Sequence, residues 1–229
     1  MKKIWKYLLI LTLLIVFWNQ TVVGPFKAVS LVFHKVGHAL ASALSGFGVS
    51  AFRMIYGNSG DIVFGANSWI ASFIIANSGY ISSILFCLFI FFLKKTKLKK
   101  YTVGSITIIY IAISIVFNSS IKTLVTSLAF SGMVILILMM QKESLNDLMI
   151  DIIGMSMAAY VIYDTFVNTI LLKLNGQLSI VQSWGTQPPE DIVRLSELTG
   201  FPTLIWGGIW LAITVVSVNI LLIKVISKK

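Results

Sequence analysis

The sequence is poor in the residues that carry most soluble-protein chemistry. Among 229 residues it has one cysteine, two histidines and eight acidic residues. The single cysteine, Cys87, excludes an intrachain disulfide and a thiolate metal cluster. Only 11% of the residues are charged, while 57% are hydrophobic, whereas a soluble domain carries about 25% charge. We therefore expect one integral membrane domain that covers residues 1–229.

The excess of positive charge, formally +10, raises the question of nucleic-acid binding. The lysines gather in "MKKIWK", in "KKTKLKK" (residues 94–100) and in "KVISKK", each beside an apolar run. This placement is typical of the cytoplasmic flanks of membrane helices. The sequence does not show the basic face with interleaved aromatic residues that nucleic-acid binding requires. We therefore expect a multi-pass protein of the cell membrane that contacts the lipid bilayer and no nucleic acid.

The apolar segments predict an all-α polytopic fold with six to seven transmembrane or re-entrant helices. A glycine-rich stretch with β-prone residues follows the second segment and predicts a short membrane-associated β-hairpin near residues 48–65. The region between the last two segments, which contains "TQPPEDIVRLSEL", is expected to be a polar loop. The segments cover residues 7–23, 26–45, 69–93, 101–118, 124–140, 148–172 and 201–226.

Two histidines lie four residues apart in "LVFHKVGHALASALSG" (residues 31–46). On a helix His34 and His38 share one face, so both can offer an imidazole nitrogen to one zinc ion. Asp164 lies well inside the sixth apolar segment, where an ionisable group costs at least about 2.5–3.5 kcal/mol and should face the bundle interior. It is the deeply placed carboxylate that we expect as the third metal ligand. Asn168, four residues later, lies on the same helix face.

Several motifs resemble a known family. "FHKVGHALASALSGFGVSAFRM" is similar to the metal-binding helix of the site-2 protease family, the intramembrane zinc metallopeptidases. The resemblance is to its compact bacterial peptidase family B-like subgroup. "NSGYISSILF" (77–86) and "EDIVRLSELTGFPTLIWGGIW" (190–210) resemble later parts of that subgroup. The resemblance implies one zinc ion on His34, His38 and Asp164, a membrane protein or peptide as substrate, and a bacterial cell membrane as the location.

Three further residues are expected to line a substrate-binding site. Arg53 and Asn77 are assigned this role by their position in the resemblance alone. Asn168 is assigned it because it shares a helix face with Asp164.

The sequence departs from the family's H-E-x-x-H motif at its centre, because Lys35 stands in the place of the glutamate. The resemblance implies that this glutamate takes a proton from the attacking water and passes it to the leaving amine. A protonated lysine only donates hydrogen bonds and cannot accept that proton. It would also repel a metal ion, since two positive centres in low dielectric are strongly unfavourable.

Three hypotheses follow for the function. In the first, the protein is a site-2 protease-like metallopeptidase homologue that Lys35 makes catalytically impaired. In the second, it is an active but atypical intramembrane metallopeptidase with a neutral Lys35 or substrate-assisted proton transfer. In the third, it is a metal-free membrane binding protein in which Lys35 forms an ion pair with Asp164, since a buried charge needs a partner.

Overall fold

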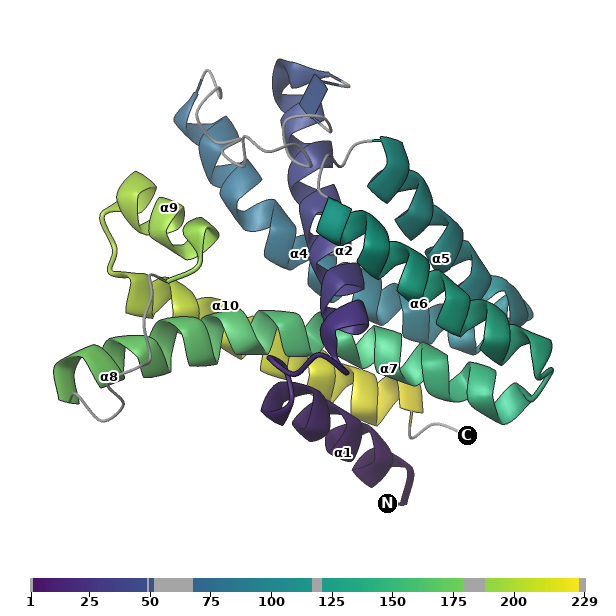
Figure 1. The fold of residues 1–229 in the computed structure, drawn as a ribbon. Coiled ribbons are helices and arrows are strands. Elements are labelled where there is room, and N and C mark those ends of the chain that lie inside the picture. The colour runs from purple at the N-terminus through teal and green to yellow at the C-terminus, as the bar shows by residue number, and fades with distance from the viewer. Residues whose placement is uncertain (1, 49, 52–67, 117–120, 179–187, 227–229) are drawn as a thin grey trace.

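The computed structural model describes residues 2–48, 50–51, 68–116, 121–178 and 188–226. These residues form helices and short π-helical segments that pack into one bundle (Figure 1), and no strand occurs among them. The expected all-α class is therefore confirmed for this part of the chain, while the hairpin near residues 48–65 lies almost entirely outside it. The elements are α1 (Lys2–Val16), α2 (Gly24–Ser42), η1 (Ala43–Phe47), α4 (Trp69–Lys94), α5 (Lys99–Val116), α6 (Ile121–Met139), α7 (Glu143–Ile162), η3 (Tyr163–Leu171), α8 (Leu172–Leu178), α9 (Glu190–Thr199), α10 (Thr203–Ile220) and η4 (Leu221–Ile226).

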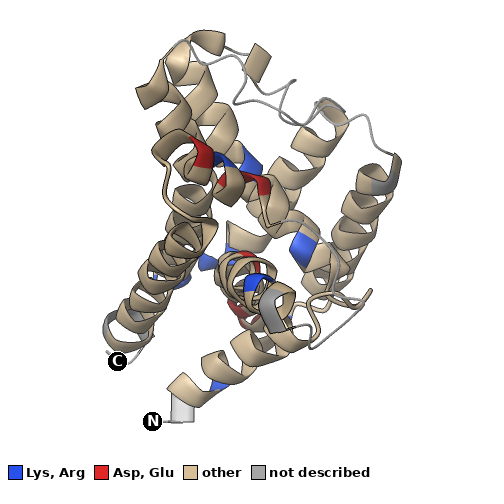
Figure 2. Ribbon diagram, turned by 90° about the vertical axis from the view of Figure 1, so that its left-hand side faces the viewer, with Lys and Arg blue, Asp and Glu red and all other residues tan. Residues whose placement is uncertain are grey.

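The length and apolar character of the helices identify a membrane protein. Charged residues are sparse along the ribbon, most of which is neutral (Figure 2). Two further apolar helices, Ile4–Val16 and Thr123–Met139, are shorter than a full span. The expected count of six to seven crossings thus remains a prediction. Within the described residues, the four helices long and apolar enough to cross a bilayer are Trp69–Lys94, Lys99–Val116, Glu143–Gly176 and Thr203–Ile223.

A buried carboxylate joins the first helix to the bundle. Asp151 on α7 is completely buried, and it accepts a hydrogen bond from the Lys6 ammonium at 2.8 Å. The Lys94 ammonium, at the end of α4, binds the other oxygen of the same carboxylate. The first two lysine clusters therefore lie at the same end of the molecule, where α1, α4 and α7 meet.

The histidine-bearing helix α2 packs closely along α4. A Cβ atom built on Gly37 would lie 2.5 Å from the Cβ atom of Ser82, so only glycine permits this approach. The Ser82 hydroxyl donates to the Phe33 carbonyl at 2.8 Å across the same contact. Small residues at helix interfaces have this effect in membrane proteins, because they let the backbones come together.

Helix α7 continues through η3 into α8 as one long rod (Figure 1). The π-helical segment η3 begins at Tyr163 and contains Asp164. Such segments are rare and often mark functional sites.

The region expected as a polar loop contains a further helix, α9, and this is a correction to the sequence-based assignment. The helix begins after Pro189 and ends at Gly200, whose φ of +73° is the left-handed conformation of a helix C-cap. Ile192 and Leu195, three residues apart on one face, are fully buried. The apolar face of α9 therefore docks the helix on the bundle, and this docking fixes the position of its polar residues.

Candidate metal centre

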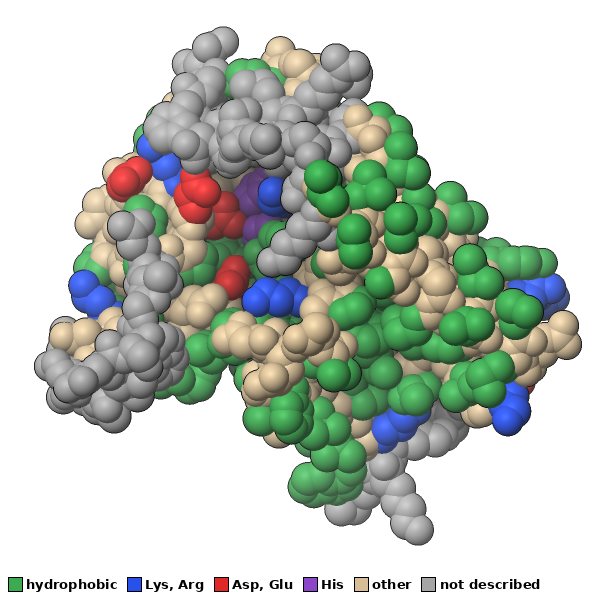
Figure 3. Space-filling model, viewed as in Figure 1, with side chains coloured by type: hydrophobic (Ala, Val, Ile, Leu, Met, Phe, Trp, Pro, Cys, Tyr) green, Lys and Arg blue, Asp and Glu red, His purple; other side chains and the backbone are tan. Residues whose placement is uncertain are grey.

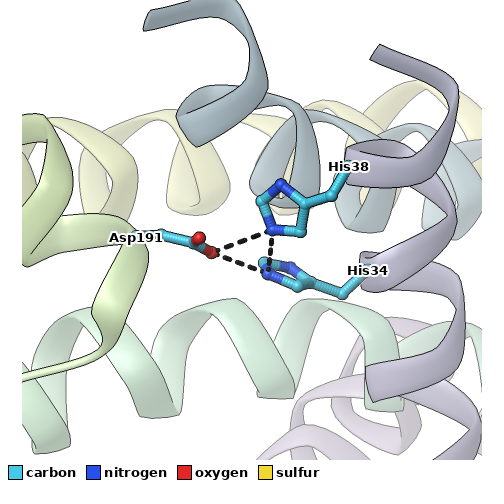
Figure 4. Close-up of side chains that lie close together, drawn as sticks. All are labelled: His34, His38 and Asp191. Atoms are coloured by element: carbon cyan, nitrogen blue, oxygen red, sulfur yellow. Dashed lines mark hydrogen bonds and ion pairs between the residues drawn. The ribbon is translucent and has the colours of Figure 1, made fainter. Parts of the chain in front are cut away.

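Three side chains from two helices converge on one point (Figure 4). His34 Nε2 lies 2.8 Å from Asp191 Oδ2, and His38 Nε2 lies 3.2 Å from the same oxygen. The two Nε2 atoms are 3.1 Å apart. Both imidazoles are buried and Asp191 is half-buried. These residues are a group of potential metal ligands, with one ligand atom each.

The outer nitrogen of each ring has a partner that leaves Nε2 free to bind a cation. His38 Nδ1 lies 2.8 Å from the Ile75 carbonyl, which can only accept, so Nδ1 carries the hydrogen. His34 Nδ1 lies 3.3 Å from the Ser83 hydroxyl. That hydroxyl donates to the Gly79 carbonyl at 3.1 Å and can accept from the histidine. Metal-binding histidines commonly have such a partner, which sets the tautomer and the ring orientation.

The space at the centre depends on Gly79 of α4. A Cβ atom built there would lie 2.5 Å from His34 Cε1 and closer still to both Nε2 atoms. The absence of a side chain at this position therefore leaves room for the two imidazoles and for whatever they bind.

The geometry fits a small divalent cation. Two imidazole nitrogens with lone pairs directed at one point repel each other unless a cation or an added proton lies between them. Zinc bound tetrahedrally at about 2.0–2.1 Å separates its nitrogen and oxygen ligands by about 3.3 Å. The three observed separations, between 2.8 and 3.2 Å, are slightly shorter. A small outward movement of the three side chains would accommodate the ion.

The histidines also favour the ionised form of Asp191. Burial acts to raise the pKa of this carboxyl group, but when a proton lies at the centre in place of a cation, the charge of His38 and hydrogen bonds from His34 and His38 lower it well below its usual range. Asp191 also lies in the first turn of α9, where the helix dipole favours negative charge. The site therefore presents a carboxylate, the form that a metal ion needs.

Asp164, the third ligand expected from the sequence, is not one of the residues in this group. Its Oδ1 accepts a hydrogen bond from Asn168 Nδ2 at 3.1 Å, and it is also hydrogen-bonded to Tyr160. The Tyr160 ring lies 4.8 Å from the His34 ring, measured between centroids. Asp164 and Asn168 thus reach the centre indirectly, through one aromatic side chain.

The remaining expected residues are Asn77, Arg53 and Lys35. Asn77 is buried on α4, two residues before Gly79, and its amide donates to the Phe73 carbonyl at 2.8 Å. Arg53 lies outside the described residues. Lys35 is half-buried beside His34.

The Lys35–Asp164 ion pair expected from the sequence stays a prediction. The charge of Glu190 acts on Lys35, and the charge of Lys27 acts on Asp164.

Sequence reasoning missed Asp191 because it placed "PPEDIVRLSEL" in a loop. A usable signal was present. Pro189 is followed by two acidic residues, as at many helix N-termini, and the buried Ile192 and Leu195 follow at helical spacing. A short helix with that pattern must dock on apolar surface, and docking would bring Asp191 to the protein interior.

One of the comparisons with known proteins identifies a family. The model of the family described as Peptidase M50B-like matches residues 7–221 of the chain. No curated protein and no solved structure matches it. The chain therefore belongs to the Peptidase M50B-like family, within the site-2 protease group of membrane metallopeptidases.

Proposed function

We propose that the protein is a site-2 protease-like metallopeptidase homologue that binds one zinc ion through His34, His38 and Asp191. The observation that carries the proposal is the convergence of two Nε2 atoms and one carboxylate oxygen within 3.2 Å of one another. The protein would act on membrane proteins or peptides in a bacterial cell membrane. When bound, zinc acts as a Lewis acid that polarises a peptide carbonyl and makes water a better nucleophile near neutral pH.

We propose further that Lys35 impairs hydrolysis. A protonated lysine has no lone pair and cannot take a proton from water. The adjacent His34 puts that positive charge next to the ligand group, where it also weakens metal binding. The protein would then bind membrane substrates or partners and cleave them slowly or not at all.

Elemental analysis of the purified protein in detergent tests the ligand set. We expect about one zinc ion per chain in the wild type. Asp191→Asn should weaken zinc binding at least about 100-fold, the upper end of what outer-shell changes cost. Asp164→Asn is the matched control and should keep its zinc. Loss of zinc from Asp164→Asn and not from Asp191→Asn would instead restore the ligand that the sequence predicted.

A metal-free binding protein is the second candidate, and one observation favours it. The contact of Asp191 with His34, at 2.8 Å, has an ordinary length for a hydrogen bond between a protonated imidazole and a carboxylate. Wild-type protein that folds and contains no zinc after purification in zinc-containing medium would support this candidate. Cleavage of a membrane-tethered reporter by the wild type, abolished by His38→Ala, would instead establish an active enzyme.

A further inference from the structure

The residue that replaces the family glutamate lies opposite an acidic residue of α9. Lys35 follows His34 on α2, and Glu190 precedes Asp191 on α9. The contact of 2.8 Å between His34 and Asp191 brings these two pairs of neighbours together. Figure 3 shows the histidines in a hollow, with acidic side chains to their left and a basic side chain directly to their right.

The charges of these neighbours interact. Glu190 lies close enough to Lys35 for its charge to act on the ammonium group. Lys35 is half-buried, and a charge removed from water needs a partner of opposite sign. An acidic residue at the start of α9 meets that need.

The two ends of α9 are held by different forces. At its C-terminal end, the indole of Trp69 donates to the Leu198 carbonyl at 2.7 Å, and the indole of Trp206 donates to the Thr199 hydroxyl at 3.0 Å. At its N-terminal end, the contact with the histidines is made by a carboxylate. The buried Ile192 also anchors the first turn, so the position of this turn depends on charge as well as on apolar packing.

We propose that Lys35 holds the first turn of α9 through Glu190 and thereby positions Asp191 between the two histidines. Lys35 is then a positioning residue. A direct consequence concerns the substitution of Lys35 by the family's glutamate. Lys35→Glu restores the family motif, but it sets a new carboxylate on α2 against the carboxylates of Glu190 and Asp191. The like charges repel, so this substitution alone displaces α9, whereas Lys35→Glu combined with Glu190→Gln displaces it less.

The docking of α9 can be measured by hydrogen–deuterium exchange of its backbone amides in chelator-treated, metal-free protein. We expect α9 in Lys35→Glu to exchange on the order of tenfold faster than in the wild type. The double variant Lys35→Glu/Glu190→Gln should return toward the wild-type rate. Glu190→Gln alone should accelerate exchange. Glu197→Gln is the matched control, because Glu197 lies on the same helix, is exposed and pairs with Arg194; it should leave the rate unchanged.

The sign of the Glu190→Gln effect decides the proposal. Acceleration when Lys35 is present, together with slowing when Lys35→Glu is present, supports it. The same effect in both backgrounds, or wild-type exchange in Lys35→Glu, overturns it. If Lys35→Glu fails to fold, judged by exchange in α7, the same cycle with Lys35→Gln carries the test: Glu190→Gln should then have no effect when added to Lys35→Gln.

The inference rests on the proposed function only for its second readout, the zinc affinity of the same four proteins. In a double-mutant cycle the direct effect of each charge on zinc cancels. We expect the change in zinc affinity of the double variant to differ by about tenfold from the product of the changes of the two single variants. Coupled exchange without zinc binding would leave the inference standing and refute the metal site. Zinc binding with additive effects would do the reverse.

Discussion

Replacing Gly79 with alanine adds one methyl group at the point where the three potential ligand atoms meet. In an ordinary helix interior this change is favourable by about 1 kcal/mol, because glycine is a poor helix former. Here the new Cβ atom would lie 2.5 Å from His34 Cε1. An ordinary contact of this kind begins at 3.4 Å, so the ring must move by about 0.9 Å, which is 3.4 minus 2.5.

The two consequences of that movement differ in size. Overpacking of a well-packed interior costs about 1–3 kcal/mol, and the gain in helix propensity offsets about 1 kcal/mol of it. The net loss of stability is therefore at most about 2 kcal/mol. A displacement of about 0.9 Å, by contrast, equals almost half of a metal–nitrogen bond length, which is about 2.0 Å. Zinc affinity should fall at least about 100-fold.

Competition with a chromophoric chelator gives the zinc affinity in detergent, and thermal unfolding gives the stability. Gly132→Ala on α6 is the matched control, since a Cβ atom there meets nothing within 4 Å. It should bind zinc as the wild type does and be slightly more stable. Wild-type zinc affinity in Gly79→Ala would refute the reasoning, because it would mean that the histidine rings do not bind the metal where α4 confines them.

Two further predictions concern the contacts that hold the helices. Asp151→Asn leaves the Lys94 ammonium without its buried anion and should cost about 3 kcal/mol, measured as a lower melting temperature. Asp147→Asn, at a carboxylate that is one-third exposed, should cost less than about 1 kcal/mol, and equal losses would contradict the role given to burial. Thr199→Val removes the acceptor of the Trp206 indole and should loosen α9 by about 1 kcal/mol. Unchanged exchange of the α9 amides would show that this hydrogen bond does not hold the helix.

The parts of the site that follow from local sequence were predictable. His34 and His38 share a helix face because they are four residues apart, and the apolar run around them predicts the helix itself. The low charge and the apolar runs predicted a membrane protein, and the described helices bear this out.

The third carboxylate was not predictable by the same reasoning, because it depends on contacts between distant segments. Depth in an apolar segment favoured Asp164, which the structure uses in hydrogen bonds with Asn168 and Tyr160. The carboxylate at the histidines comes from a short amphipathic helix, which lies between the long apolar segments and has few apolar residues of its own. Only two fully buried residues, Ile192 and Leu195, bring it to the centre.

The contact between His34 and Asp191 also sets when the site can form during synthesis. The two residues are 157 positions apart in the chain. At about 5–20 residues per second, a ribosome adds the second one roughly 8–30 s after the first. During that interval the nascent chain has both imidazoles but lacks the α9 carboxylate. The complete group of three potential metal ligands is therefore one of the last features to be assembled, and a truncated chain that ends before α9 cannot form it.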